Sequence, residues 1–152
     1  MITPVVEFVK LHQKAICPVR KTDGAAGFDL FALHDILFEP GAIFDIPIGI
    51  GCVIPHGYVG IIRSRSGLYF NHRVQAFHGT IDADFRGEIV VSMSQAWSRD
   101  PQIVKYRWAF AQMVVMPCLL TGVEITPEEF ANRPTDRGAR GLGSTDVVEF
   151  KP

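Results

Sequence analysis

The sequence predicts a single all-β domain, and three observations lead to this prediction. The 14 glycines and 10 prolines are spread so evenly that no long helical window survives between them. Short apolar or alternating runs of strand length recur between turn signals. The 152 residues, of which 47% are hydrophobic, suffice for one compact core without disulfides or a structural metal. A jelly roll, a sandwich or a small barrel fits this pattern.

The strand-length runs are residues 5–9, 42–46, 52–54, 59–63, 74–77, 89–93, 103–106 and 110–116. Turn-forming residues separate them at 39–41, 55–57, 86–87 and 98–101. One helix of a turn or two is predicted to start at Thr126, because Thr126 can cap it and Pro127 suits its first position. Glu129 can complete a capping box there.

Residues 1–131 are expected to form the β domain, and residues 132–152 a mobile, glycine-rich arm. Between residues 132 and 146 the composition shifts to Arg, Gly, Thr, Asp and Ser, and Leu142 is the only large apolar side chain. A run with strand character follows at residues 147–150, so the arm is tethered on both sides. A frayed terminus is the alternative interpretation.

Charge and cysteine usage limit the classes of partner. Lys and Arg number 15 against 16 Asp and Glu, so stable nucleic-acid binding is disfavoured, although convergent arginines can still hold a small anion. The N-terminal residues lack a signal-peptide pattern, and the longest apolar run, residues 113–120, is too short to cross a bilayer. The three cysteines have no metal-ligand spacing, which indicates reduced thiols. We therefore expect a cytoplasmic protein that binds neither nucleic acid nor membranes.

Asp82 and Asp84 form the first candidate site, in the hairpin-like segment 79–87. Carboxylates at i and i+2 of an extended segment point to one face, so the two could hold a water, a sugar hydroxyl or a hydrated cation. Acidic residues beside glycines are more often turn formers, and spacing alone favours that interpretation. The five histidines have no zinc-ligand spacing, and a serine-hydrolase elbow is absent from the sequence.

A second candidate ends an apolar run, where Arg63 and Arg65 are expected to point to the same face. With the hydroxyl of Ser66 and the bare backbone of Gly67, they could cradle a phosphate. Structural ion pairs at a solvated strand end explain the same residues equally well.

Two further candidates lie near the ends of the chain. In the arm, Arg137, Arg140, Ser144 and Thr145 stand among glycines whose backbone N–H groups could fold over a triphosphate. A flexible linker is the favoured alternative there. Asp29 lies among small and apolar residues at the start of a strand, where it either anchors a turn or supports a cation site.

These segments occur in the order of the five motifs of the homotrimeric dUTPase family, and the chain resembles that family over nearly its whole length. The matching segments are residues 25–30, 65–68, 79–87, 111–112 and 137–145. The resemblance implies a jelly-roll-like β-clip subunit and a homotrimer. It also implies active sites that are shared between subunits and closed by the C-terminal arm of a neighbour.

The family reaction is the hydrolysis of dUTP to dUMP and pyrophosphate with Mg²⁺ on the phosphates. It limits uracil incorporation into DNA and supplies dUMP for thymidylate synthesis. Asp82 matches the catalytic aspartate, which orients or deprotonates the attacking water and contacts the 3'-hydroxyl. Asp29 matches a position behind the magnesium shell, where it acts through water. Substrate contacts are implied for Arg65, Ser66, Gly67, Gly79, Ile81, Phe85, Gln112, Arg137, Leu142, Gly143 and Ser144.

The chain departs from the family motifs at several positions. Phe85 replaces a Tyr but keeps the ring that packs under the deoxyribose and excludes a 2'-hydroxyl. Leu142 stands where a Phe usually stacks on the base. Residues 107–109 are Arg-Trp-Ala in place of the usual Gly-Asp-Arg. Phe77 and His78 are bulkier than the usual residues of the uracil-reading hairpin.

Three alternatives differ in their reaction. A dCTP deaminase shares the fold, but its general-base glutamate would stand at Ser92, so deamination is disfavoured. A pyrophosphatase for a modified deoxyuridine triphosphate would explain the changes near the base. A non-catalytic nucleotide-binding or regulatory protein would explain the altered fourth and fifth motifs, but it would not need Asp82, Arg65 and Gln112 together.

Overall fold

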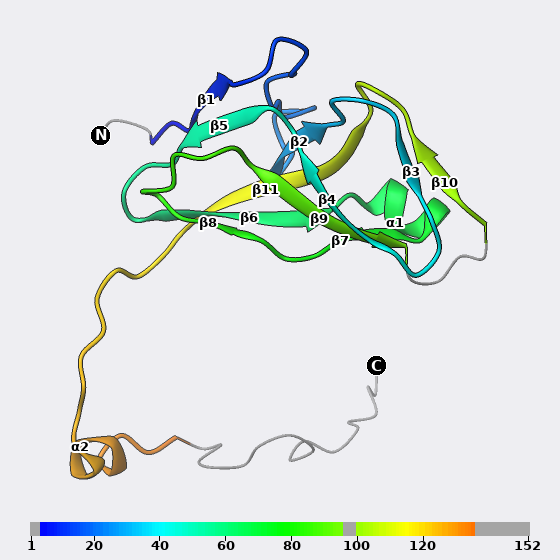
Figure 1. Cartoon of the computed structure of the whole chain (residues 1–152). Coiled ribbons are helices and arrows are strands. Elements are labelled where there is room, and N and C mark those ends of the chain that lie inside the picture. The colour runs from blue at the N-terminus through cyan, green and yellow to red at the C-terminus, as the bar shows by residue number, and fades with distance from the viewer. Residues whose placement is uncertain (1–3, 96–99, 136–152) are drawn as a thin grey trace. The chain divides into compact units, whose positions relative to one another are not determined.

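The fold is all-β, as the sequence predicts (Figure 1). It is seen in a computed structural model that describes residues 4–95 and 100–135. The helices of these residues are α1 (Ser66–His72) and α2 (Pro127–Ala131), and neither is long or apolar enough to cross a membrane. The strands are β1 (Glu7–Lys10), β2 (Gly27–Phe31), β3 (Ile36–Phe38), β4 (Ile43–Pro47), β5 (Ile50–Val53), β6 (Tyr58–Ser64), β7 (Val74–Ala76), β8 (Thr80–Ile81), β9 (Val90–Gln95), β10 (Gln102–Val104) and β11 (Ala109–Pro117).

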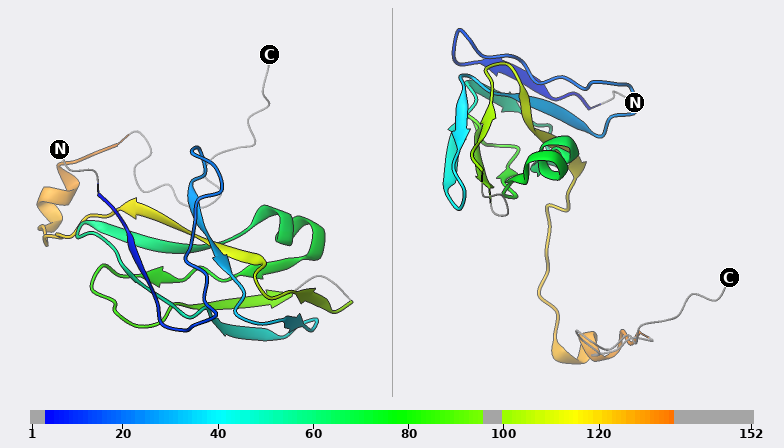
Figure 2. Two further views of the ribbon diagram at one scale, coloured as in Figure 1. Left: turned by 90° about the horizontal axis from the view of Figure 1, so that it is seen from above. Right: turned by 90° about the vertical axis from the view of Figure 1, so that its right-hand side faces the viewer.

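The strands pair antiparallel in four sheets within the described residues. One sheet has the order β2-β11-β6-β8, a second has the order β4-β9-β7, and β1-β5 and β10-β3 form two-stranded ribbons. Most pairs join strands that are far apart in the sequence. The yellow strand β11 runs beside β6 in Figure 1, and the left view of Figure 2 shows the same sheet from above. Such long-range antiparallel pairing is typical of jelly-roll-like folds.

One hydrophobic core is shared by the sheets. Leu30 and Met113 come from the four-stranded sheet and Met93 from the three-stranded sheet, and none of the three is exposed. Cys52 on β5 is also buried in this core, and burial raises the pKa of its thiol. All three cysteines of the chain are free thiols in the structure.

Each of the eight strand-length runs between residues 5 and 116 overlaps a strand, whereas the sequence analysis missed β3, β8 and α1. The run with strand character at residues 147–150 lies outside the described residues. Helix α1 lacks the usual signals at its ends. Its N-cap is Arg65, whose side chain makes no capping bond, and its C-cap is Arg73, with a positive φ of 56° where Gly is usual. None of its residues is buried, so no apolar periodicity marks it. Strands β3 and β8 are too short for an alternating pattern.

The chain divides into two compact units, Met1–Leu120 and Thr121–Pro152. In the second unit, α2 begins with the predicted capping box. The Thr126 hydroxyl accepts from the backbone N–H of Glu129, and the Glu129 carboxylate accepts from the backbone N–H of Thr126. The division into a β domain and an arm at residue 131 stays a prediction, because residues 136–152 lie outside the described part.

Candidate functional site

Three polar residues lie side by side across the four-stranded sheet. Gln112 on β11 pairs with Asp29 on β2 and, on its other side, with Arg63 on β6. Directly paired residues of antiparallel strands point to the same face of a sheet. Long-range pairing therefore brings the first, second and fourth motif segments together.

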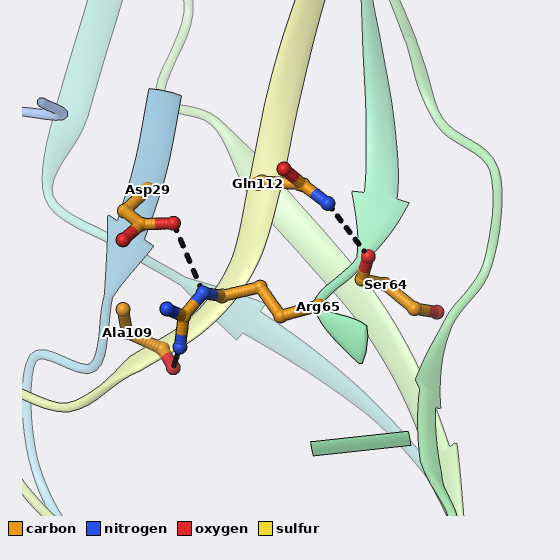
Figure 3. Close-up of polar contacts among 5 residues, drawn as sticks. All are labelled: Asp29, Ser64, Arg65, Ala109 and Gln112. Atoms are coloured by element: carbon orange, nitrogen blue, oxygen red, sulfur yellow. Dashed lines mark hydrogen bonds and ion pairs between the residues drawn. The ribbon is translucent and has the colours of Figure 1, made fainter. Parts of the chain in front are cut away.

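Arg65 is held from two sides at the end of β6 (Figure 3). Its Nε donates to Asp29 Oδ1 at 2.9 Å, and its Nη1 donates to the backbone carbonyl of Ala109 at 2.8 Å. Ala109 lies at a β-bulge, where the register of β11 against β2 shifts between Ala109 and Ala111. The two bonds fix the guanidinium plane. No described residue binds Nη2, which is left for a ligand.

Asp29 and Arg65 form a half-buried ion pair, with 14% and 31% of their side chains exposed. Charge-assisted bonds in such partly dry surroundings are stronger than those between neutral groups. Removing either partner would leave an uncompensated charge next to the sheet. The pair therefore fixes the position of Arg65 and lowers the net positive charge that Arg65 adds to the site.

Gln112 ties β11 to the end of β6. Its Nε2 donates to the carbonyl of Ser64 at 2.9 Å, immediately before Arg65 (Figure 3). Its Oε1 lies against Gly27, where an added Cβ atom would come within 2.6 Å of it. A side chain at position 27 would therefore displace the amide group. The unusual Arg-Trp-Ala at 107–109 does not keep Gln112 from this position.

A pocket of about 280 Å³ opens beside these side chains. The Ser66 hydroxyl has no hydrogen-bond partner among the described residues, so it joins Arg65 Nη2 as a free donor. Two such donors suit an oxyanion such as a phosphate group. The sequence analysis missed Lys21, which lies in a loop without a motif. The lining residues are Lys21, Ala25, Gly27, Asp29, Arg65, Ser66, Gly67 and Gln112.

The predicted cradle of Arg63 and Arg65 is found only in part, because Arg65 lines this pocket and Arg63 does not. Arg63 lies within β6, and Arg65 follows the end of β6 with an extended backbone at the N-cap of α1. Arg63 Nη1 instead lies 3.0 Å from His78 Nε2. His78 and Phe77 line a separate pocket of about 130 Å³ beside Gly79.

Asp82 begins a turn, which corrects the extended segment expected there. The backbone N–H of Phe85 donates to the carbonyl of Asp82 at 3.1 Å, and Arg86 Nη1 donates to the carbonyls of Ala83 and Phe85, each at 2.7 Å. Both Asp82 and Asp84 nevertheless line the same hollow of about 910 Å³. The exposed Asp82 carboxylate accepts no hydrogen bond from a described residue. Arg86, which holds this turn together, was not identified from the sequence.

The Phe85 ring packs on the backbone of Gly87. An added Cβ atom at Gly87 would lie 2.6 Å from Phe85 Cζ, so only glycine leaves room for the ring in this position. Phe85 is 39% exposed, and its ring is therefore available as a flat apolar surface. Such a surface suits packing against the face of a sugar or a base.

Strand β8 and helix α1 lie toward opposite ends of β6 (Figure 1). The Asp82 turn follows β8, and the Arg65 pocket adjoins the start of α1. Ile81, next to Asp82, pairs with Gly60, whereas Arg65 follows the last residue of β6. At about 3.3 Å per residue, the five residues from Gly60 to Arg65 span roughly 16 Å. Asp82 and Arg65 therefore do not contact each other directly within a single chain. The predicted contacts Arg137, Leu142, Gly143 and Ser144 lie outside the described residues.

The described residues contain no group of three or more His, Cys, Asp or Glu side chains that could hold a metal ion. Asp29 Oδ1 accepts from Arg65, and no described residue binds Oδ2. One carboxylate oxygen beside oxyanion donors suits a cation that is held mainly by phosphate oxygens and water. Mg²⁺ commonly binds in this way, so the donor set fits it.

Comparisons with known proteins identify the family of the chain. The family model described as dUTPase matches residues 13–146. The deoxyuridine 5'-triphosphate nucleotidohydrolase of Nautilia profundicola is 40% identical over 90% of this chain and 94% of its own length. That of Syntrophotalea carbinolica is 38% identical over 95% and 99%. The solved dUTPase of Staphylococcus bacteriophage 80alpha, with dUPNHPP, has a TM-score of 0.82 at 23% identity and covers 95% of this chain and 100% of its own. The chain belongs to the dUTPase family.

Proposed function

We propose that this dUTPase-family protein hydrolyses dUTP to dUMP and pyrophosphate at a site that combines the Arg65 pocket with the Asp82 turn. The single observation that carries the proposal is the pocket in which Arg65, Ser66 and Gln112 meet, although their strands are far apart in the sequence. Family membership supplies the reaction, and the geometry suggests what each side chain contributes.

The phosphates of dUTP bind in the Arg65 pocket. Arg65 Nη2 and the Ser66 hydroxyl donate to phosphate oxygens, while the bonds to Asp29 and Ala109 keep the guanidinium plane in place. Donors that are already oriented do not have to reorganise as charge develops in the transition state. Gln112 fixes the backbone just before Arg65 through its bond to Ser64.

Asp82 acts on the attacking water. Its carboxylate orients or deprotonates the water that attacks the α-phosphorus, and it contacts the 3'-hydroxyl of the sugar. General-base help of this kind contributes about 10²- to 10⁴-fold in rate. The exposed carboxylate and the turn closed by Phe85 and Arg86 support this role.

The nucleoside packs between the Phe85 ring and the pocket beside Gly79. Phe85 lies under the deoxyribose and leaves no room for a 2'-hydroxyl, and Gly79 and Ile81 contact the base and sugar through the backbone. The pocket of about 130 Å³ at Gly79 is lined by Phe77 and His78, so these two side chains border the base.

The site is completed between copies of the chain in a homotrimer. The separation of roughly 16 Å between the Asp82 turn and the Arg65 pocket supports this, since the two do not contact each other within one chain. Arg137, Leu142, Gly143 and Ser144 of the C-terminal arm close the site over the substrate. We expect the protein to act in the cytoplasm.

Mg²⁺ is the cofactor that fits the site. When bound to the triphosphate it would offset phosphate charge, and Asp29 would hold one of its waters through Oδ2. A solved dUTPase from phage phi11 of S. aureus coordinates a structural Mg(II) ion, but its 22% identity to this chain supports only a common fold.

Pyrophosphate release from a panel of nucleotides tests this function. The panel contains the deoxynucleoside triphosphates, UTP and a 5-substituted dUTP, each with and without Mg²⁺. Magnesium-dependent release from dUTP alone is expected. Preference for the 5-substituted nucleotide would indicate a neighbouring pyrophosphatase, and nucleotide binding without release would indicate a non-catalytic protein.

Asp82→Asn tests the assigned role of the carboxylate. It should lower turnover about 10²- to 10⁴-fold and leave binding of dUpNHpp nearly unchanged. Asp23→Asn is the matched control, because Asp23 is exposed and lines neither the Asp82 hollow nor the Arg65 pocket. Equal turnover in Asp82→Asn and the wild-type protein would contradict the role of Asp82.

A further inference from the structure

We infer that Lys21 is a further substrate-binding residue, whose ammonium group binds the polyphosphate of the nucleotide in the Arg65 pocket. This inference rests on the proposed function of that pocket. Lys21 lines it together with Arg65, Ser66 and Gln112, although it belongs to none of the motif segments. No described residue forms a hydrogen bond or an ion pair with its ammonium group.

The charge balance of the pocket gives Lys21 its importance. Among the lining residues, Arg65 carries a positive charge and Asp29 a negative one, and the two are paired at 2.9 Å. Without Lys21 the net charge of the lining side chains is therefore zero. A terminal phosphate alone carries about 1.5 to 2 negative charges at pH 7. Among the lining residues, Lys21 supplies the positive charge that is not balanced by a carboxylate.

The loop that carries Lys21 is folded before any ligand arrives. Asp29 donates its backbone N–H to the carbonyl of Val19 at 2.8 Å, and Ala25 donates to Thr22 at 3.0 Å. The Arg20 guanidinium binds the carbonyl of Ala25 at 2.8 Å and that of Asp23. Arg20 is thus occupied in holding the loop.

This preorganisation reduces the cost of binding through Lys21. Its backbone is already held beside Asp29, so contact with a phosphate needs only the ordering of one flexible side chain. An ammonium group binds phosphate as a point charge and does not require one fixed direction of approach. It can therefore contact both the bound triphosphate and the released pyrophosphate.

Steady-state kinetics of the full-length protein test the inference. Lys21→Ala should raise the KM for dUTP roughly 5- to 20-fold, with kcat within about twofold, because a charge-assisted contact to a partly exposed phosphate is lost. Lys21→Arg should restore most of the affinity. Lys10→Ala is the matched control, since Lys10 is exposed on β1 and lines neither the Arg65 pocket nor the Asp82 hollow.

Calorimetric binding of inorganic pyrophosphate gives a readout that does not depend on turnover. The Kd of Lys21→Ala for pyrophosphate should rise by a similar factor, and its dependence on ionic strength should weaken because one charge pair is lost. If the wild-type protein releases no pyrophosphate from dUTP but binds pyrophosphate through Lys21, the proposed function fails and the inference stands. Wild-type turnover with the same KM and Kd in Lys21→Ala and Lys10→Ala would overturn the inference alone.

Discussion

Gly27→Ala should destabilise the protein through a clash with a single neighbour, Gln112. An added Cβ atom would lie 2.6 Å from Gln112 Oε1 and 3.2 Å from Gln112 Cβ. The amide can rotate away, but the Cβ atom of Gln112 is fixed on β11, so the paired strands must also shift. Overpacking of this kind costs about 1 to 3 kcal/mol.

Two smaller effects of Gly27→Ala act in opposite directions. Loss of the bond from Gln112 Nε2 to Ser64 costs about 0.5 to 1.5 kcal/mol. Removal of a glycine from the unfolded chain returns about 0.4 to 1 kcal/mol, because Gly27 does not have a positive φ that alanine would avoid. The net expected loss in the free energy of unfolding is about 1 to 3 kcal/mol.

Thermal unfolding followed by circular dichroism measures this loss. In a domain of this size each kcal/mol lowers Tm by about 2 to 4 °C. All variants are compared at one protein concentration, because assembly makes Tm depend on concentration. Gly24→Ala is the control, since no atom lies within 4 Å of its added Cβ atom, and its effect should stay within about 0.5 kcal/mol.

A double-mutant cycle with Gln112→Ala identifies the cause. In the Gln112→Ala background Oε1 and Cδ are gone and only the contact with Cβ at 3.2 Å remains, so Gly27→Ala should cost at least about 1 kcal/mol less than in the wild-type background. The coupling energy between the two positions should therefore exceed about 1 kcal/mol. An equal cost of Gly27→Ala in both backgrounds would refute the reasoning.

Four further predictions concern other parts of the chain. Arg107 has a left-handed backbone with φ of 69°, which glycine adopts without strain. Arg107→Gly should therefore raise the free energy of unfolding, measured by urea denaturation, by about 0.5 to 1 kcal/mol. Unchanged stability would show that this backbone is not strained. Deletion from Arg137 onward should lower dUTP turnover without changing Tm, and full activity of the shortened chain would exclude a closing role for the arm. Phe85→Ala should raise the ratio of kcat/KM for UTP to kcat/KM for dUTP, whereas Phe85→Tyr should leave this ratio unchanged. The same ratio in the wild-type protein and in both variants would show that Phe85 does not select the sugar. Hydrogen bonds from Thr126 lower the pKa of the Glu129 carboxyl group. The capping box should therefore stabilise α2 fully above the ordinary pKa of a Glu carboxyl group, and this stabilisation should be lost as the pH falls through the lowered pKa. Amide NMR shifts of Thr126 that do not change with pH would contradict this.

Local chemistry made some elements predictable from the sequence. The capping box at Thr126 was found because its hydrogen bonds join residues three apart, so the pattern is visible in the chain itself. The long strand β11 was found because its apolar run exceeds the length of any turn. Helix α1 was missed because Arg65 and Arg73 stand at its ends in place of the usual capping residues.

The candidate site was predictable where a motif carried it and not where tertiary pairing decided it. The order of the segments identified Arg65, Ser66 and Gln112, and the structure brings these residues to one pocket. Arg63 does not line this pocket, and its guanidinium lies beside His78, a contact between residues 15 apart that no local pattern marks. Lys21 enters the pocket through the bridge between Val19 and Asp29, a pairing that sequence alone does not reveal.

The separation along β6 has a genetic consequence under the proposed sharing of sites. An inactive Asp82 variant and an inactive Arg65 variant each keep the half of the site that the other has lost. The two variants can be mixed in equal amounts, unfolded together and reassembled. About a quarter of the sites in a random trimer should then combine an intact Asp82 turn from one variant with an intact Arg65 pocket from the other. An inactive Asp82 allele and an inactive Arg65 allele should therefore complement each other in one cell. Alleles that affect the same end of β6 should not.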